Sequence, residues 1–274
     1  MQVPNLTSSV RAALIQRGTL TTTRFCFAGC AFCRLAVPLP KVPANRAPAG
    51  LALQSIESGL AWDDVDEVHM RGGLSLREPF DYWVQLVRRI REKTSARLVV
   101  FSPVEIFQFH TLERRTLREL LRLLKWAGAD ALGPGGSETF DDELRQHWAP
   151  YRLTADEWIR TAEVAAAVEL PLHAAPIVTP KTTFEDWQRY CARLSAVPVE
   201  RVVIKPLASE GTRLGSYGDT NIVLVADAVR VIKDHRPGLA LGVHYSGGAV
   251  DDARLIFGSA GADSVLTDVW EASP

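Results

Sequence analysis

The stretch Phe25-Cys26-Phe27-Ala28-Gly29-Cys30-Ala31-Phe32-Cys33 brings three cysteines together within nine residues. Their spacing, C-x3-C-x2-C, gives three thiolates on one tight loop, a ligand set that can hold three corners of an iron–sulfur cube. A cubane cluster has four irons, so one iron is left without a protein ligand. That iron can bind a small molecule and pass an electron to it, which a fully ligated electron carrier cannot do.

Two other uses of these cysteines fit the sequence less well. A structural zinc site usually needs four ligands in two pairs, and the chain has no second C-x2-C or H-x3-H pair. A redox C-x2-C pair would leave Cys26 without a role. The fourth cysteine, Cys191, is isolated within a predicted helix, where a small packed side chain is the simplest interpretation. We therefore predict a 4Fe–4S cluster on Cys26, Cys30 and Cys33.

Length and composition indicate a protein with one large core. The chain has 274 residues, of which 47% are hydrophobic, and α/β barrels of this length fold as one domain, so we predict a single domain over residues 1–274. A formal charge of −1 favours neither nucleic acid nor a membrane as a partner. Residues 1–20 lack the apolar segment of a signal peptide, and no run is long enough to span a bilayer, which predicts a cytoplasmic protein.

Short β-rich runs alternate with longer amphipathic runs along the chain. The predicted strands are residues 20–23, 67–70, 97–101, 129–132, 172–177, 201–204, 240–245 and 264–266. The predicted helices are residues 82–91, 116–126, 154–168, 183–194, 222–233 and 251–257. This alternation predicts a full or nearly full α/β barrel of the (β/α)8 type, with catalysis at the carboxyl ends of its parallel strands. The cysteine loop follows the first strand at that end, and the proline-rich segment 38–48 is predicted to be a loop over the cluster.

Glycines and polar residues follow the next three predicted strands. Gly72-Gly73 lets the backbone approach a ligand closely, although an ordinary β–α turn has the same composition. Ser102-Pro103 favours a turn, so Glu105 is expected near the barrel mouth. After the fourth strand, Ser137 and Glu138 are able to form hydrogen bonds with a ribose or an amino group of a ligand.

Histidines and cations near the strand ends are further candidates. His173 and His244 lie in apolar runs, where a histidine is more often a packed core residue than a substrate contact. Four cations near strand ends can pair with a carboxylate of a ligand, namely Arg71, Lys181, Lys205 and Arg213. Lys205, beside Pro206 at a strand end, is the best candidate, whereas surface solvation is the default for Arg213.

These motifs resemble those of the radical S-adenosylmethionine (SAM) enzymes, whose signature includes an aromatic residue before the last cysteine, here Phe32. Within that superfamily the chain resembles one subgroup. The subgroup contains aminofutalosine synthase, dehypoxanthine futalosine cyclase and the tyrosine-using subunit of deazaflavin (FO) synthase. The matching stretches are residues 26–33, 72–73, 101–106, 135–138, 153–158, 206–207 and 261–264.

The resemblance implies cofactors, partners and residue roles. SAM is expected to chelate the open iron of the 4Fe–4S cluster through its amino and carboxylate groups. The cofactor-binding residues are expected to be Phe32, Gly72, Gly73, Ser137 and Glu138, while Glu105 and Lys205 face the substrate as catalytic residues. An external one-electron reductant of the flavodoxin or ferredoxin type is implied as a partner.

The reaction implied is reductive cleavage of SAM to a 5′-deoxyadenosyl radical, which acts on a small-molecule biosynthetic substrate. The radical either adds to an unsaturated carbon with C–C bond formation, as in an adenosyl transferase, or abstracts hydrogen, as in a cyclase. Resemblance to aminofutalosine synthase favours addition.

Three departures separate the chain from this subgroup. Val99 stands where the family has a histidine, Val178-Thr179-Pro180 replaces a Tyr-Gly-His element, and a C-terminal extension is missing. These departures concern the substrate pocket rather than the radical-generating half. Two other classes are alternatives: an iron–sulfur or zinc protein that does not cleave SAM, and a scaffold barrel that binds no cluster.

Overall fold

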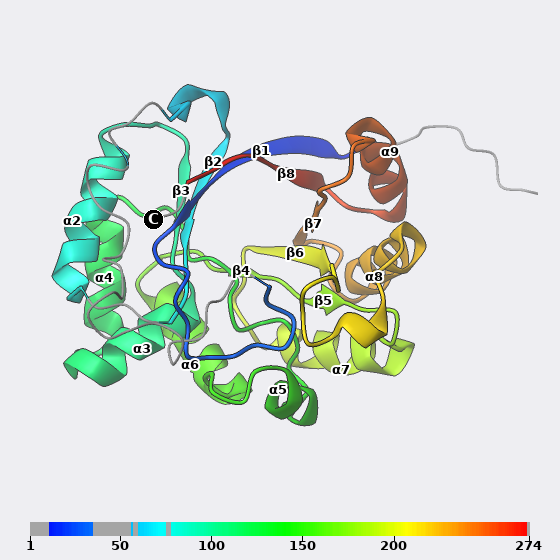
Figure 1. Ribbon diagram of the computed structural model, residues 1–274, viewed down its shortest axis with the longest axis horizontal. Coiled ribbons are helices and arrows are strands. Elements are labelled where there is room, and N and C mark those ends of the chain that lie inside the picture. Colours follow the sequence, from blue (N-terminus) through cyan, green and yellow to red (C-terminus); the bar gives the residue numbers. More distant parts are fainter. Residues whose placement is uncertain (1–10, 35–55, 57–59, 75–77, 273–274) are drawn as a thin grey trace, which may run out of the picture.

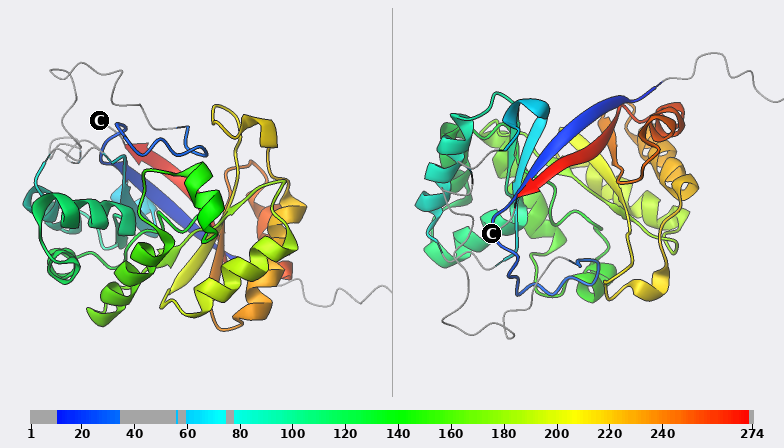
Figure 2. Two further views of the ribbon diagram at one scale, coloured as in Figure 1. Left: turned by 90° about the horizontal axis from the view of Figure 1, so that it is seen from below. Right: turned by 45° about the horizontal axis from the view of Figure 1, so that its top comes forward.

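Parallel strands curl around a common axis, and helices cover them from outside (Figure 1). The structure is a computed structural model, and it describes residues 11–34, 56, 60–74 and 78–272, so the predicted loop 38–48 lies outside the described residues. The strands are β1 (Ala13–Thr21), β2 (Glu67–Arg71), β3 (Arg97–Val100), β4 (His173–Ala174), β5 (Ile177–Val178), β6 (Arg201–Pro206), β7 (Ala240–His244) and β8 (Ser264–Ala272). Their order in the sheet is β3-β2-β1-β8-β7-β6-β4, with β5 also paired to β6. Figure 2 shows the two longest strands, β1 and β8, side by side.

Residues 131 and 132 connect the two ends of this strand order. Ala131 forms a single parallel bridge with Val99 of β3, and Leu132 forms one with Leu172, next to β4. The Leu132 N–H donates to the Pro171 carbonyl at 2.8 Å. The sheet is therefore continuous around the axis, and the predicted barrel of parallel strands is confirmed, with its fourth strand reduced to two bridges.

Helices follow the strands along the chain and pack on their outer faces. They are α2 (Phe80–Arg91), α3 (Pro103–Glu113), α4 (Leu117–Ala127), α5 (Asp142–Trp148), α6 (Ala155–Ala167), α7 (Phe184–Ser195), α8 (Ile222–His235) and α9 (Val250–Ala260), with short 3₁₀ turns at η2 (Trp62–Asp64) and η3 (Gly215–Tyr217). Their apolar faces are buried, as in α4, where Leu120, Leu121 and Leu124 are fully covered. Within the described residues, no helix is long and apolar enough to cross a bilayer.

Side-chain caps explain where several helices begin. Thr154 precedes α6, where it and Glu157 form a reciprocal capping box, as the sequence predicts. Thr183 and Asp186 form the same box before α7. Because the cap satisfies N–H groups that have no partner within the helix, the boundary of the element is fixed by the sequence itself.

Besides the fourth strand, the main differences from the predicted elements lie in five places, one of which is β8, which runs six residues beyond its predicted end at 266. The first strand covers β1, seven residues earlier than the predicted start at 20. The predicted strand 172–177 is divided into β4 and β5, because Pro176 has no N–H to donate to a ladder. Helix α3 occupies the segment predicted only as a turn, and its apolar residues do not keep to one face, so its sequence lacks a helical period. Helix α5 is only seven residues long, too short for a clear period.

The barrel interior is polar where β1 and β2 face it. Residues two apart on a strand share a face, and the register pairs Arg17 with Glu67, Thr19 with His69, and Thr21 with Arg71. Across the interior, the Arg201 guanidinium of β6 donates to the Glu67 carboxylate. Because both side chains are buried, this ion pair closes the lower part of the barrel, and the cavity lies above it.

Candidate active site

The cysteine loop follows β1 directly and is held by hydrogen bonds to three other parts of the chain. The Gly73 N–H donates to the Thr23 carbonyl at 2.7 Å, and the Ala31 N–H donates to the Trp148 carbonyl at 2.6 Å. The Arg213 N–H donates to the Ala31 carbonyl at 2.9 Å, and its guanidinium donates to the Gly29 carbonyl. Arg213, for which surface solvation was the default, therefore anchors this loop.

All three cysteines of the loop are half-buried, carry free thiols and line one cavity of about 250 Å³. Burial raises the pKa of the Cys30 thiol to about 11, although the nearby Arg152 guanidinium opposes this shift. Cys191, by contrast, is buried in α7 away from the loop.

The glycine turn after β2 packs directly against the cysteine loop. A Cβ on Gly73 would stand 2.1 Å from the Phe25 carbonyl oxygen and 3.0 Å from the Cys26 Cβ. A Cβ on Gly72 would stand 1.8 Å from the Thr22 Oγ1. Only glycine permits this approach, so the turn and the loop form one unit on the cavity wall.

Glu105 lies in the first turn of α3 and supports this glycine turn. Its carboxylate accepts hydrogen bonds from the Ser102 hydroxyl and, at 3.4 Å, from the Gly72 N–H. Burial raises the pKa of Glu105, although both hydrogen bonds oppose the shift. Phe101, which lies just before the N-cap of α3, has a φ of 55°. This conformation is rare for an aromatic residue, and it reverses the chain above the cavity.

Glu138 and Arg152 form a largely covered ion pair beside Cys30. The Arg152 guanidinium is 3.0 Å from the Glu138 carboxylate and 3.7 Å from the Cys30 Sγ, and it also faces the Phe32 ring with its carbon 5.9 Å from the centroid. Burial disfavours the charged form of Glu138, but Arg152, two backbone hydrogen bonds and Arg145 together outweigh that effect and hold the pKa of Glu138 below its ordinary value. A carboxylate and a cation thus stand next to the predicted cluster ligands.

Ser137 lies just behind this pair, outside the cavity lining. Its hydroxyl donates to the Pro134 carbonyl at 2.6 Å and accepts from the Ala175 N–H at 2.7 Å. The Tyr190 hydroxyl donates to the Ser137 carbonyl at 3.1 Å. The side chain is fully buried, so it fixes the loop that carries Glu138.

The remaining candidates lie deeper in the barrel or outside it. Lys205 of β6 is half-buried and lines the cavity, and burial lowers its pKa to about 7. His173 is fully buried on the cavity wall, with its Nε2 3.2 Å from the Glu200 carboxylate. His244 lies 3.1 Å from the Asp268 carboxylate, and burial lowers its pKa to about 4.

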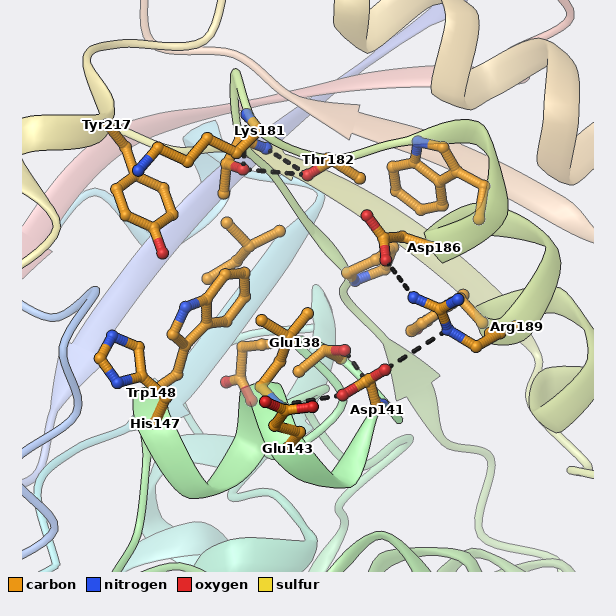
Figure 3. A pocket seen from close by; sticks show the side chains of 17 residues that line it. Glu138, Asp141, Glu143, His147, Trp148, Lys181, Thr182, Asp186, Arg189 and Tyr217 are labelled. Atoms are coloured by element: carbon orange, nitrogen blue, oxygen red, sulfur yellow. Dashed lines mark hydrogen bonds and ion pairs between the residues drawn. The ribbon is translucent and has the colours of Figure 1, made fainter.

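Lys181 belongs to a second, outer pocket of about 480 Å³ between α5 and the start of α7 (Figure 3). Its ammonium nitrogen lies 3.9 Å from the centroid of the Tyr217 ring. Figure 3 also shows Arg189 between the carboxylates of Asp141 and Asp186. This pocket shares only Glu138 with the cysteine cavity, and it contains none of the cysteines.

Arg152 is the main site residue that the sequence analysis did not identify. It lies in a coil after α5, not at a strand end, so its position offers no signal in a barrel where sites follow strands. The only trace in the sequence is its place one residue before the matching stretch 153–158.

The donor set of the cavity fits a 4Fe–4S cluster. Three thiols line one cavity, a glycine turn packs against the loop that carries them, and the Arg152 guanidinium beside Cys30 offsets thiolate charge. Among the described residues, no three His, Cys, Asp or Glu side chains converge on a site for a single ion. A cubane does not need such convergence, because each thiolate binds a different iron.

Comparison with known proteins shows which proteins the chain is similar to. No family model matches the chain. Over 93% of its length the chain superposes on 72% of methylornithine synthase with a TM-score of 0.64 at 15% identity, which shows a shared fold. Its homologues are radical SAM enzymes.

The individual relatives are those that the sequence resembles. Aminodeoxyfutalosine synthase of Thermus thermophilus is 26% identical over 182 residues, covering 64% of this chain and 47% of that protein. FO synthase of Streptomyces coelicolor is 30% identical over 145 residues, covering 52% of this chain and 16% of that protein. Cyclic dehypoxanthine futalosine synthase of Halalkalibacterium halodurans is 27% identical over 121 residues, 44% of this chain and 33% of that protein. The chain thus matches less than half the length of these curated relatives, and the predicted resemblance is confirmed.

Proposed function

We propose that this chain is a radical SAM enzyme that acts on a small-molecule biosynthetic substrate. The observation that carries the proposal is one cavity at the carboxyl end of the barrel that contains three free cysteines, the glycine turn and the Glu138–Arg152 pair. In this proposal Cys26, Cys30 and Cys33 hold a 4Fe–4S cluster that leaves one iron free for SAM. The bound cluster supplies the single electron that cleaves SAM to a 5′-deoxyadenosyl radical.

The chain's own residues bind and orient SAM in this proposal. Arg152 offers its guanidinium to the SAM carboxylate, and Glu138, kept ionised by Arg152, accepts from the SAM ammonium or ribose hydroxyls. Gly72 and Gly73 present their carbonyl groups, because their N–H groups already donate to Glu105 and Thr23, and Phe32 covers the cluster side of the cavity.

Two further residues act by holding these groups in place. Ser137 holds the Glu138 loop, and Glu105 holds the glycine turn through the Gly72 N–H. Both side chains are buried, so their hydrogen bonds operate in a low-dielectric setting, where lost partners are costly.

The substrate occupies the part of the cavity toward Lys205, away from the cysteines. The radical adds to an unsaturated carbon of the substrate with C–C bond formation, or abstracts hydrogen from it, and enclosure of the cavity excludes water and stray hydrogen donors. An external reductant of the flavodoxin or ferredoxin type supplies the electron. The resemblance to aminodeoxyfutalosine synthase favours addition.

Anaerobic reconstitution with iron and sulfide tests this function, and the chain offers a matched pair of cysteine variants. The wild type and C191A should incorporate a cluster and release 5′-deoxyadenosine from SAM under reductant, whereas C30A should lose both. A chain that binds iron or zinc without cleaving SAM would instead be a metal-binding protein, and one that binds neither would be a scaffold. With a substrate present, free 5′-deoxyadenosine indicates abstraction and a covalent adenosyl adduct indicates addition.

A further inference from the structure

His244 and Asp268 form a hydrogen-bonded dyad at the carboxyl end of β7. The His244 Nε2 lies 3.1 Å from the Asp268 carboxylate. The Arg17 guanidinium donates two hydrogen bonds of 2.7 and 2.9 Å to the same carboxylate, and the Thr19 hydroxyl donates to it at 3.3 Å. The dyad is therefore held in place by β1, the strand that leads into the cysteine loop.

The register of the strands turns His244 toward the barrel interior. Val203 of β6 lines the cavity and pairs with Gly242 of β7. Side chains on one face of a strand are two residues apart, so His244 shares the face of Gly242, and Lys205 shares the face of Val203. His244 therefore stands beside Lys205, next to the part of the cavity in which the substrate is proposed to lie.

The Nδ1 atom of the His244 ring is a hydrogen-bond acceptor. Burial disfavours the charged form of Asp268, but the hydrogen bonds and charges of His244 and Arg17 outweigh that effect and hold the pKa of Asp268 far below its ordinary value. An ionised carboxylate can only accept, so Nε2 carries the ring proton and Nδ1 has a lone pair. Burial, with the charges of Arg17 and Lys205, lowers the pKa of His244 to about 4 against the opposing hydrogen bond to Asp268, so the ring is neutral.

This Nδ1 atom has no partner within the protein, and it is accessible. Among the residues that the structure describes, none donates a hydrogen bond to it. The Nδ1 of His173 also lacks a partner, but that atom is completely buried, whereas the Nδ1 of His244 is not. The His244 side chain is 22% exposed. A ligand that brings a donor to this position therefore gains a hydrogen bond without displacing one of the protein's own.

We propose that His244 binds the substrate, with its Nδ1 accepting a hydrogen bond from an uncharged donor, a hydroxyl or amide N–H group. The inference rests on the proposed function and adds the hydrogen-bonding chemistry of the substrate. An ammonium group would be repelled by Arg17 and Lys205, and a carboxylate would meet the Nδ1 lone pair with no proton between them. Asp268 is a positioning residue, because it fixes the tautomer and the orientation of the ring.

Calorimetric binding of phenol and anisole to the cluster-reconstituted protein with SAM tests this assignment. The two probes have similar shapes, but only phenol has a hydroxyl proton to donate. Phenol should bind about fivefold more tightly than anisole to the wild type, the contribution of one hydrogen bond. H244Q should lose this preference, because the glutamine amide can still donate to Asp268 while the ring acceptor is gone. H235Q is the matched control and should keep the preference, since His235 is an exposed residue at the end of α8.

D268N tests the tautomer with the imidazole intact. Its amide group can donate to Nε2, which moves the ring proton to Nδ1, so D268N should also lose the preference for phenol. Equal affinities of the wild type for phenol and anisole overturn the assignment without any variant, and so does a preference that persists in H244Q or D268N. Loss of SAM affinity in H244Q would assign His244 to SAM and overturn it as well. Release of 5′-deoxyadenosine by the wild type is measured separately and tests only the proposed function.

Discussion

Replacing Gly73 with alanine tests whether the glycine turn sets the position of the cysteine loop. The added Cβ would stand 2.1 Å from the Phe25 carbonyl oxygen and 2.7 Å from the Phe25 carbonyl carbon. Both are backbone atoms, so no side chain can rotate away. The carbonyl must withdraw by about 1.3 Å to reach the 3.4 Å at which ordinary contact begins. Because Cys26 is the next residue, its thiol moves with that carbonyl.

The expected loss is large in activity and moderate in stability. A displacement of about 1 Å in a reacting group can cost about 100-fold in rate, so G73A should release 5′-deoxyadenosine about 100-fold more slowly. Overpacking of this kind costs about 1–3 kcal/mol in the free energy of unfolding. The control is G238A, because a Cβ on Gly238 would meet nothing within 4 Å.

The assays are iron and sulfide content after reconstitution, the rate of 5′-deoxyadenosine release, and urea unfolding of the reconstituted protein. G238A should match the wild type in all three. A G73A protein with wild-type iron content and wild-type rate would show that the glycine turn does not set the position of the cysteine loop.

Three further predictions concern the helix cap and the buried carboxylates. T154A should lower the free energy of unfolding by about 1 kcal/mol in urea while 5′-deoxyadenosine release stays unchanged, because the capping box lies outside the cavity. E105Q should keep the Gly72 hydrogen bond and flatten the pH dependence of stability measured by urea unfolding at several pH values. The raised pKa of Glu105 means that its contribution is complete below the unfolded value of 4.5 and is lost as pH rises through the folded pKa. R152M should leave Glu138 buried without its cation, lower stability by about 3 kcal/mol and abolish 5′-deoxyadenosine release, whereas adding E138Q should restore the stability alone.

The fold was predictable because its signals are local. The strands β2, β3, β6 and β7 fall within two residues of their predicted bounds, since short β-branched runs lie between clear helical periods. The fourth strand was harder, because residues 131 and 132 make only single bridges. Bridges of that kind depend on neighbouring strands, which a single sequence does not reveal.

Site residues that directly follow strands could be predicted from the sequence, whereas a site residue in coil between two helices could not. The cysteines, the glycine turn, Glu138 and Lys205 all line one cavity, as their positions after successive strands indicate. Arg152 reaches the same cavity from the coil between α5 and α6. Its role depends on packing against Phe32 and Glu138, contacts between segments that sequence spacing alone does not bring together.

Charged side chains occupy two levels of the barrel interior: the Glu67–Arg201 pair at the lower end, and Arg71 with Lys205 in the cavity above it. Most barrels of this type fill their interior with branched apolar residues, but here the floor is closed by the Glu67–Arg201 pair, to which the His69 ring is joined at 2.8 Å from Glu67. Burial opposes ionisation of Glu67, yet His69 and Arg201 hold its pKa far below the ordinary value, so the pair stays charged. The charges of this buried pair are satisfied within the protein. The same two strands carry Arg71 and Lys205 at the upper level, where both side chains line the cavity and the Asp268 carboxylate acts on both cations.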